Sequence, residues 1–324
     1  MSADPLSDVL RTVRLTGAVF YDSVAHEPWV AEQPPPGEIL PMILPGAEHL
    51  IAYHVVTAGN CFGGLIGGEQ LPLKGGDVIV FAHGDPHVLS SAPGMRADLD
   101  AAARERAAMS GRLPFIVEHP GAGPVAARFV CGYLACDALP FNPLINQLPR
   151  VIVARDDGSG WLAQFIRVAT EESANRRAGG ESVLAKLSEL MFIEVVRRHL
   201  QSLPAEQAGW LAGLRDPFVG KALTALHTAP AREWTIEDLG HEVGLSRSVL
   251  AERFNDLVGV PPMQYLARWR MQIAAGLLAG GRSSIAEIAE EVGYGSEAAF
   301  SRAFKAAVGL PPAAWRRRSA ATAA

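Results

Sequence analysis

The spacing of apolar and polar residues changes along the chain, and the changes predict where β-structure gives way to helix. Up to about residue 155, short apolar runs rich in Val and Ile are bounded by Gly, Pro and Asp, which is typical of β-strands. These runs are HLIAYHVV (49–56), DVIVFA (77–82), ARFVCGYLA (127–135) and RVIVAR (150–155). Many short strands with tight turns predict a small barrel or sandwich. Residues 93–124 predict a long excursion with room for one short helix.

From residue 160 the apolar residues follow a helical period. Trp161, Phe165 and Val168 predict one helix, and a second carries Val183, Leu184, Leu187, Leu190, Met191 and Val195. This helical pair is a candidate dimer contact, and the alternative is that it packs only on its own barrel. Residues 201–214, which contain Pro204 and Gly209, predict a linker. Residues 216–318 are predicted to be helical.

The helical segment contains an internal repeat, which is a primary signal in a sequence. IEDLGHEVGLSRSVLAERFNDLVGVPP begins at Ile236, and IAEIAEEVGYGSEAAFSRAFKAAVGLPP begins at Ile285. The first half of the repeat matches at an offset of 49 residues and the second half at 50. The extra residue falls in the turn between two predicted helices, where an insertion costs little. A helical bundle with a chance repeat would not explain this agreement.

Each repeat has the parts of a helix-turn-helix. A capping residue precedes the first helix, a glycine suited to a left-handed conformation ends it, and a serine caps the second helix. These residues are Thr235, Gly244 and Ser246 in the first unit, and Ser284 (with Glu287 in a capping box), Gly293 and Ser296 in the second. The second helix buries apolar residues at i and i+4, which leaves its other face free for a major groove.

Residues 262–281 between the repeats predict one long connecting helix. Roughly 18 residues at ~1.5 Å each span about 27 Å. Recognition helices on one face of B-DNA lie about 34 Å apart. A connector of this length is compatible with two readers on adjacent major-groove segments.

The pattern over residues 216–318 strongly resembles the C-terminal domain of the AraC/XylS family of bacterial regulators, above all in GYGSEAAFSRAFKAAVGLPPAAWR. The resemblance implies base-facing side chains early in each second helix. These positions are Arg247, Ser248, Ala251, Glu252, Glu297, Ala298, Ala299 and Arg302. Arg302 could bind guanine bidentately and Glu252 could accept from cytosine. Lys305, Arg268 and Arg316 to Arg318 are interpreted as phosphate contacts. For each residue, the alternative is a solvated surface charge.

Charge becomes informative only when the chain is divided. The net charge is −5, yet residues 216–318 hold 12 Lys and Arg against 11 Asp and Glu, and the remainder holds 17 against 23. A local basic face matters more for DNA binding than the total. The N-terminus lacks the apolar stretch of a secretory signal and no apolar run is long enough to span a membrane, so we expect a cytoplasmic protein with no membrane partner.

The front of the chain, about residues 5–155, resembles the cupin-type sensor domain found ahead of such DNA-binding domains. YHVVTAGN (53–60) and GGDVIVFAHGDPH (75–87) carry the resemblance. Metal-dependent cupin enzymes use two histidines and a carboxylate, followed by a later histidine. His87 stands at the later position, but His49 and His54 are five apart and point to opposite faces of a continuous strand. We therefore expect no metal and no cofactor.

Three hypotheses remain for the front domain. It could be a cupin oxygenase, although its ligand set is short. It could bind a small effector through His54, His83 or His87, although structural histidines would look the same, and we favour this effector-binding role. It could sense redox state through Cys61, Cys131 or Cys136, although small buried core cysteines are the commoner case. Cys131 and Cys136 lie five apart in one predicted strand, so a disulfide between them is geometrically poor.

The sequence thus predicts an α+β protein of two domains and no enzymatic activity. A cupin-like β-barrel with a helical pair precedes an all-α domain that has two helix-turn-helix motifs joined by a long helix. The expected parts are a sensor domain (1–155), a helical dimerisation region and linker (156–215), and a DNA-binding domain (216–318) with motifs at about 235–258 and 284–308. The expected function is transcriptional regulation, more often activation in this family. Expected partners are double-stranded DNA, an unknown small-molecule effector, RNA polymerase and a second copy of the chain.

Overall fold

The computed structural model describes residues 4–43, 47–97, 115–137, 140–155, 160–175, 177–204, 208–281 and 283–322. Its contacts divide the chain into two compact units. The barrel unit comprises Leu15–Cys136 and Pro149–Gln201, and the helical unit comprises Met1–Arg14, Asp137–Leu148 and Ser202–Ala324. Residues 1–14 and 137–148 therefore group with the helical unit, which the sequence pattern did not indicate.

The barrel unit is built on a mixed sheet in which the long strand β3 is shared by two groups of strands. The strands are β1 (Thr16–His26), β2 (Val30–Gln33), β3 (His49–Leu65), β4 (Gln70–Lys74), β5 (Val78–Phe81), β6 (His87–Ser90), β7 (Phe115–His119), β8 (Val125–Cys136) and β9 (Val151–Ala154). The first part of β3 pairs with β5 and β8, and its last part with β4 and β6. One strand thus joins both groups, and the sheet closes into a half-barrel.

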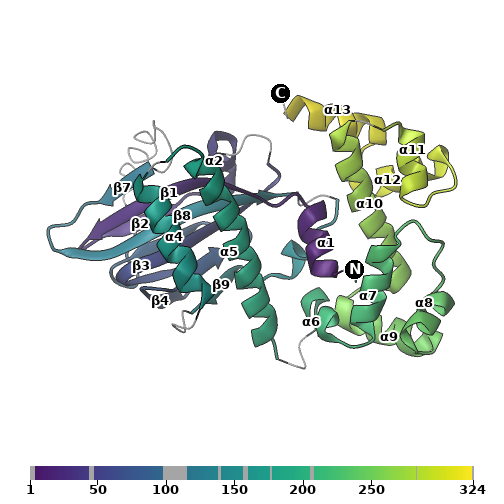
Figure 1. Ribbon diagram of the computed structural model, residues 1–324, viewed down its shortest axis with the longest axis horizontal. Helices are drawn as coiled ribbons and strands as arrows, with labels where there is room; N and C mark the ends of the chain where they lie inside the picture. The colour runs from purple at the N-terminus through teal and green to yellow at the C-terminus, as the bar shows by residue number, and fades with distance from the viewer. Residues whose placement is uncertain are drawn as a thin grey trace. The chain divides into compact units, whose positions relative to one another are not determined.

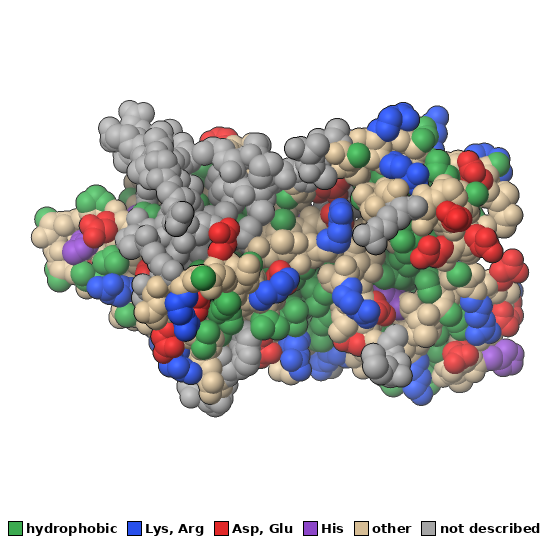
Figure 2. All heavy atoms as spheres, turned by 45° about the horizontal axis from the view of Figure 1, so that its top comes forward, with side chains coloured by type: hydrophobic (Ala, Val, Ile, Leu, Met, Phe, Trp, Pro, Cys, Tyr) green, Lys and Arg blue, Asp and Glu red, His purple; other side chains and the backbone are tan. Residues whose placement is uncertain are grey.

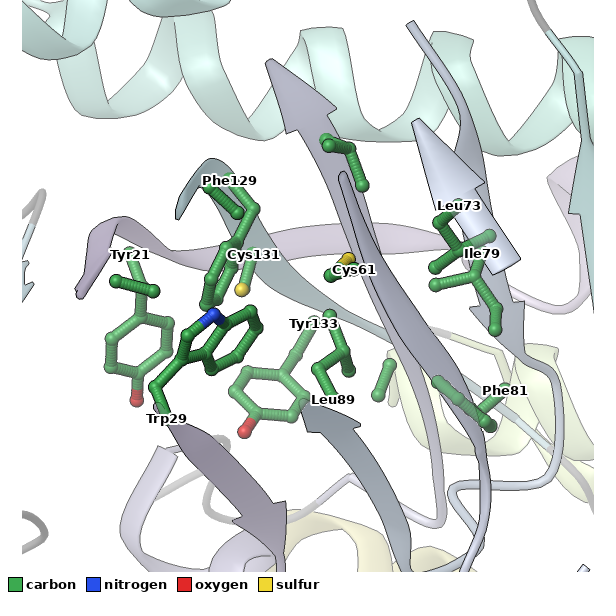
Figure 3. Packing of buried hydrophobic residues seen from close by; sticks show 14 of the residues in the cluster. Tyr21, Trp29, Cys61, Leu73, Ile79, Phe81, Leu89, Phe129, Cys131 and Tyr133 are labelled. Atoms are coloured by element: carbon green, nitrogen blue, oxygen red, sulfur yellow. The ribbon is translucent and has the colours of Figure 1, made fainter. Parts of the chain in front are cut away.

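Side chains alternate between the two faces of this sheet, as the period of a strand requires. One face encloses an apolar cluster that includes Trp29, Phe81 and Phe129 (Figure 3). Helices α4 (Trp161–Asn175) and α5 (Gly180–Ser202) lie across the other face (Figure 1). Tyr53 points to this second face, where its hydroxyl lies 2.5 Å from the Ser188 hydroxyl of α5. A short helix, α2 (Pro36–Ile43), follows β2.

Gly132 on β8 shows why the helix-covered face needs a residue without a side chain. A Cβ at this position would lie 2.3 Å from the Tyr53 hydroxyl oxygen and 2.5 Å from the adjacent ring carbon. Tyr53 is fully buried and pairs with Gly132 on the neighbouring strand, and its ring lies over the Cα of this glycine. Glycine at this strand position therefore permits a close approach of the kind expected for such residues.

The helical unit contains both repeats. Its elements are α1 (Pro5–Thr12), the 3-10 turn η1 (Ile145–Gln147), α6 (Trp210–Arg215), α7 (Val219–Thr228), α8 (Ile236–Val243), α9 (Arg247–Val258), α10 (Pro262–Gly280), α11 (Ile285–Glu291), α12 (Glu297–Val308) and α13 (Pro312–Thr322). The two predicted helix-turn-helix motifs are confirmed as α8–α9 and α11–α12. The predicted connector is α10, whose 19 residues span about 28 Å.

Helix α10 contributes to the cores of both motifs. Tyr265 and Trp269 in its first half are buried with Phe254 of α9 and His227 of α7. Its second half supplies Met271, Ala274, Ala275 and Leu278 to a separate cluster with Phe300, Phe304 and Trp315. The indole Nε1 of Trp315 donates to the carbonyl of Ala275, 3.2 Å away. Both motifs are therefore packed against one continuous helix.

Arg270 on α10 also ties the two motifs together directly. Its guanidinium donates to the carbonyls of Pro230 (2.7 Å) and Arg232 (2.8 Å), in the loop before α8. It also donates to the carbonyl of Gly293 (3.4 Å), in the turn of the second motif. Gly293 has a φ of +80°, and a Cβ there would lie 2.5 Å from the carbonyl oxygen of Ala231. The turn after α11 thus lies so close to the loop before α8 that no side chain fits between them.

Two sequence interpretations differ from the structure, and one helix was not predicted. The predicted linker over residues 201–214 contains the end of α5 and all but the last residue of α6, whose Trp210 and Leu211 are buried. The predicted excursion over 93–124 contains β7, which pairs in parallel with β1, while residues 98–114 lie outside the described residues. The N-terminal segment forms α1, which packs against α7 and α10 because Leu6 and Val9 are buried.

We expect Gly293→Ala to destabilise the helical unit more than the matched change Gly244→Ala. Both glycines are left-handed, with φ of 80° and 79°, so each alanine should cost about 1 to 2 kcal/mol. Only Gly293 faces a backbone oxygen, whereas nothing lies within 4 Å of a Cβ at Gly244. The clash should add roughly 1 to 3 kcal/mol. Urea unfolding of both variants measures the loss in free energy of unfolding. Equal losses would show that Gly293 is not in close contact with the loop before α8.

Candidate functional site

The first helix-turn-helix begins and ends where its capping residues dictate. Thr235 Oγ1 accepts from the amide of Asp238 (3.0 Å), and the Asp238 carboxylate accepts from the amide of Thr235 (3.2 Å). Gly244 ends α8 with a φ of 79°, in the left-handed region. Ser246 then starts α9 by accepting from the amide of Val249. The turn is therefore specified locally, as the sequence predicted.

The second motif repeats this arrangement. Ser284 and Glu287 form the predicted capping box, with Ser284 Oγ accepting from the Glu287 amide (3.1 Å) and the Glu287 carboxylate accepting from the Ser284 amide (2.7 Å). Gly293 is left-handed, and Ser296 starts α12 by accepting from the amide of Ala299 (3.2 Å). Both second helices consequently begin at a serine whose side chain caps the first turn, although the φ of Ser246 is −68° and that of Ser296 is −158°.

Helix α9 buries one side and exposes the other. Leu250, Phe254 and Val258 are buried, and the predicted base-facing Arg247, Ser248 and Glu252 are exposed. The guanidinium of Arg247 donates to the Glu237 carboxylate of α8 at 2.8 Å, with both side chains largely exposed. An exposed pair of this kind contributes little to stability, so it can exchange for another anion at low cost.

Val249 is a residue on α9 that the sequence reasoning missed. Its side chain is 47% exposed, next to the predicted readers Ser248 and Arg247. An exposed branched apolar side chain at the start of a recognition helix suits contact with a thymine methyl group. The sequence contains the signal, because Val249 directly precedes Leu250 and therefore falls about 100° around the helix from the side that Leu250 and Phe254 bury.

Helix α12 has the same two-sided character. Phe300 and Phe304 are buried, whereas Glu297, Ala298, Arg302 and Lys305 are exposed. Arg302 and Lys305 are three residues apart and therefore share a helix face. On the face drawn in Figure 2, acidic and basic side chains are interspersed over the helical unit, in keeping with its near-zero net charge.

The remaining predicted phosphate contacts fall into two groups. Arg268 on α10 and Arg317 on α13 are exposed. Arg316 is half-buried, and its Nη2 donates to the carbonyl of Ser283 at 2.6 Å, immediately before α11. This bond ties α13 to the start of the second motif. The geometry therefore favours a structural role for Arg316, because its guanidinium already has a backbone partner.

Inside the barrel unit, two of the predicted effector histidines meet. The Nε2 atoms of His54 on β3 and His87 on β6 lie 2.7 Å apart, and both side chains are buried. His54 Nδ1 lies 2.7 Å from the Sγ of Cys131, the residue opposite it on β8. The third predicted histidine, His83, lies instead beside His49, with ring centroids 6.0 Å apart.

Burial keeps these imidazoles neutral. Desolvation lowers the pKa of His87 to about 4, and it lowers the pKa of His54 well below its usual value together with the nearby His87 and His119. His119, on β7, is stacked on Phe129 and lies tilted beside Trp29, and burial lowers its pKa to about 4. The interior is therefore apolar, with neutral hydrogen-bonding groups set into it.

All three cysteines are free and buried. Cys61 and Cys131 belong to the apolar cluster of the barrel interior (Figure 3). In the part of the chain that the structure describes, no three His, Cys, Asp or Glu side chains are grouped so that they could hold one metal ion. No helix among the described residues is long and apolar enough to cross a membrane.

The core of the first motif contains a buried polar chain. Trp210 Nε1 donates to the Tyr265 hydroxyl (2.8 Å), which lies 2.8 Å from His227 Nε2. Helix α1 covers this chain, with the Asp8 carboxylate 3.9 Å from His227 Nδ1. Burial lowers the pKa of His227 to about 3. The N-terminal helix is thus part of the motif's own core.

Comparison with known proteins agrees with this architecture. The model of the Cupin family matches residues 4–201, and that of a helix-turn-helix domain matches residues 239–318. A putative AraC-like transcription regulator of Streptomyces lividans is 32% identical over 323 residues, covering 97% of this chain and 98% of that protein. One of Streptomyces antibioticus is 31% identical over 316 residues, covering 97% and 98%.

Among solved structures, ToxT from Vibrio cholerae O395 covers 94% of this chain and 97% of its own, with 11% identity and a TM-score of 0.35. A cupin-like half-barrel and a duplicated helix-turn-helix define a transcription regulator with a DNA-binding domain. The chain belongs to the AraC-like transcription regulators. Its relatives are named as regulators, in agreement with the prediction that it is not an enzyme.

We expect His119→Phe to make the barrel unit less sensitive to acid. The folded pKa of about 4 lies below the ordinary 6.5, so the unfolded chain binds the proton first and stability falls as pH drops from about 6.5 to about 4. Removing this group should flatten the slope by about 1.4 kcal/mol per pH unit. Urea unfolding at several values between pH 7.5 and 4.5, monitored by amide exchange in β8, measures how the free energy of unfolding depends on pH. An unchanged slope would mean that His119 is not neutral in the fold.

Proposed function

We propose that this regulator binds a specific DNA sequence by inserting α9 and α12 into two adjacent major-groove segments, and that a small-molecule or redox signal at the barrel unit controls it. One observation carries the proposal: two capped helix-turn-helix motifs share α10 and are locked together by Arg270. Such a pair can present two readers in a fixed geometry. Activation through contact with RNA polymerase belongs to the same proposal, and the expected site of action is the cytoplasm.

The exposed polar side chains of the two helices suggest how sequence is read. Arg302 has the bidentate geometry that suits guanine, and Glu252 can accept from a cytosine amino group. Arg247, Ser248, Glu297 and Ala298 complete the face that the two helices offer. Lys305 and Arg268 are suited to phosphates, which position the protein without reading sequence.

A second copy of the chain is the proposed partner of α5. Val183 is 42% exposed and Leu190 is 51% exposed, and Leu187 lies half-buried between them. Their spacing at i, i+4 and i+7 makes one apolar stripe on a helix whose opposite side faces the sheet. A dimer would cover this stripe and bring two pairs of readers to DNA, which raises avidity through effective concentration.

Selection of bound sites from a random double-stranded DNA library, at a stated near-physiological salt concentration, tests the function directly. We expect one motif with two blocks about one helical turn apart. Binding without a motif, which vanishes as the salt concentration rises, would reduce the interaction to counterion release and contradict sequence-specific reading. If the contact between the loop before α8 and the turn after α11 sets the distance between α9 and α12, a selection with Gly293→Ala should allow a broader range of spacings between the two blocks.

Arg302→Ala and Lys305→Ala should affect DNA binding in different ways. Losing a bidentate base contact should cost about 1 to 3 kcal/mol on the preferred site and relax the preference at one position. Losing a phosphate contact should weaken all sites alike and lower the salt slope by about one. Titrations on the selected site and on single-base variants at several salt concentrations separate the two. Identical profiles for both variants would refute the assignment.

Leu190→Asp should convert the dimer into a monomer, because a carboxylate would be desolvated in the interface. Ser182→Asp is the matched control, since Ser182 is exposed on the same helix but outside the apolar stripe. Sedimentation velocity of the wild type and both variants gives the oligomeric state. A wild-type monomer, or a dimer that survives Leu190→Asp, would exclude this face as the dimer contact.

A further inference from the structure

Three buried side chains in the barrel interior form a continuous hydrogen-bonded chain. Cys131 Sγ lies 2.7 Å from His54 Nδ1, and His54 Nε2 lies 2.7 Å from His87 Nε2. His87 Nδ1 lies 2.7 Å from the carbonyl oxygen of Asp85. The three side chains come from strands β8, β3 and β6, so the sheet itself sets their spacing.

The carbonyl of Asp85 fixes the direction of every bond in this chain. A carbonyl oxygen can only accept, so the proton of neutral His87 must sit on Nδ1 and leave Nε2 as an acceptor. His54 must then donate from Nε2, which leaves its Nδ1 unprotonated and facing the thiol. Cys131 therefore donates its proton to His54. A thiol hydrogen-bonded to a neutral imidazole that a third group orients is the arrangement of an activated sulfur nucleophile.

We propose that Cys131, His54 and His87 form a proton relay that makes Cys131 the thiol of the barrel unit that reacts with hydroperoxides. This inference rests on the proposed function, because it names one chemical signal that the barrel unit could receive. Cys131 is 8% exposed, so access to it is restricted and favours a small reagent such as hydrogen peroxide over a bulky one. His87 is a positioning residue in this relay, since its two ring nitrogens face His54 and the backbone carbonyl of Asp85, while its ring is stacked on Phe81.

The reaction balances without any further reactant. The sulfur attacks one oxygen of the hydroperoxide, the S–O bond forms and the O–O bond breaks. The thiol proton passes to His54 Nδ1 as the sulfur becomes nucleophilic, and it then joins the departing hydroxide or alkoxide as water or alcohol. Cysteine is oxidised by two electrons to a sulfenic acid, and the hydroperoxide is reduced by two. His54 Nδ1 carries no proton in this bonding order and faces the sulfur, so it is the atom placed to accept the thiol proton.

The other two cysteines provide controls inside the same molecule. Burial and the nearby Asp77 carboxylate raise the pKa of the Cys61 thiol to about 12, which disfavours its reactive thiolate. Cys136 is also buried, at the last residue of β8 and five residues from Cys131, where it lies across from His49. Cys61 shares the apolar cluster with Cys131 yet is paired across the sheet with Leu73. All three cysteines are therefore buried, and the contact with His54 and His87 is what sets Cys131 apart.

Oxidation of Cys131 would disturb the packing and hydrogen bonding of the barrel interior. An added oxygen replaces the S–H donor and enlarges a side chain in a closely packed cluster, which such interiors tolerate poorly. His54 and His87 would have to find new partners or move, because buried polar groups are costly when unpaired. Strands β3, β6 and β8 carry these residues, so the disturbance would begin at the centre of the half-barrel.

The test is a pulse of hydrogen peroxide on the folded full-length protein, followed by denaturation in N-ethylmaleimide and mass spectrometry of each cysteine. Only the peroxide has to enter the folded chain. We expect Cys131 to lose its free thiol at least roughly tenfold faster than Cys61 and Cys136, as general-base assistance implies. Equal rates for the three cysteines in the wild type would overturn the relay, and this comparison depends on no variant.

Two substitutions then separate chemistry from packing. His54→Gln keeps a hydrogen-bond acceptor for the thiol but cannot take up its proton, so the rate at Cys131 should fall to that of Cys61. His87→Gln keeps an acceptor for His54 and should retain the rate, whereas His87→Leu should lose most of it. If His54→Gln reacts as fast as the wild type, His54 is not the base. Unchanged rates at Cys61 and Cys136 in each variant confirm that the fold still shields the interior.

DNA binding is measured on the same samples, so that the proposed function and the Cys131 relay can fail separately. Reduced wild type and Cys131→Ser should bind the selected DNA equally, and peroxide should change the affinity of the wild type alone. If the reduced protein selects no DNA motif, the proposed function fails while the ranking of the cysteine rates still decides the relay. If Cys131 is oxidised selectively but DNA affinity is unchanged in both proteins, the relay holds and its link to regulation is refuted.

Discussion

One helix has to satisfy two hydrophobic cores at once, and the arrangement of the DNA-binding part depends on this constraint. The first half of α10 is buried with the first motif and its second half with the second motif. Arg270 completes the constraint by holding the loop before α8 and the turn after α11 with one guanidinium. A rotation of either motif would have to break a packed core and separate the Arg270 guanidinium from the carbonyls it binds, which is costly. The spacing of the two readers is therefore a property of the folded core and not of a flexible connector.

The repeats could be predicted well from the sequence because their signals are local. Capping residues, left-handed glycines and an i, i+4 apolar pair act within a few residues, so α8, α9, α11 and α12 lie where they were expected. Elements whose stability comes from distant partners were missed. Helix α1 is stabilised by contacts with α7 and α10, and α6 by burial of Trp210 against Tyr265, more than fifty positions away. Likewise, the period of a strand gives the face of His54 and of His87, but only strand pairing brings the two together.

The interior of the half-barrel shows how polar groups can be placed in an apolar core. Each buried imidazole there is neutral, and the pair at its centre is fully hydrogen-bonded through a thiol at one end and a carbonyl at the other. Such a chain has a single consistent order of donors and acceptors, so a change at one end is transmitted to the other without any movement of the backbone. His119 adds a further neutral imidazole, which packs against the rings of Trp29 and Phe129 as an apolar side chain would.

The course of the chain between its two units has a practical consequence. The chain passes from one unit to the other at residues 14–15, 136–137, 148–149 and 201–202. No single proteolytic cut can therefore release an intact helical unit. A fragment that starts at residue 202 would lack α1, which covers His227, and the loop whose Phe141 amide donates to Gln272. The part that binds DNA is completed by segments from the front of the sequence, so in this molecule the boundary between sensor and reader is not a point along the chain.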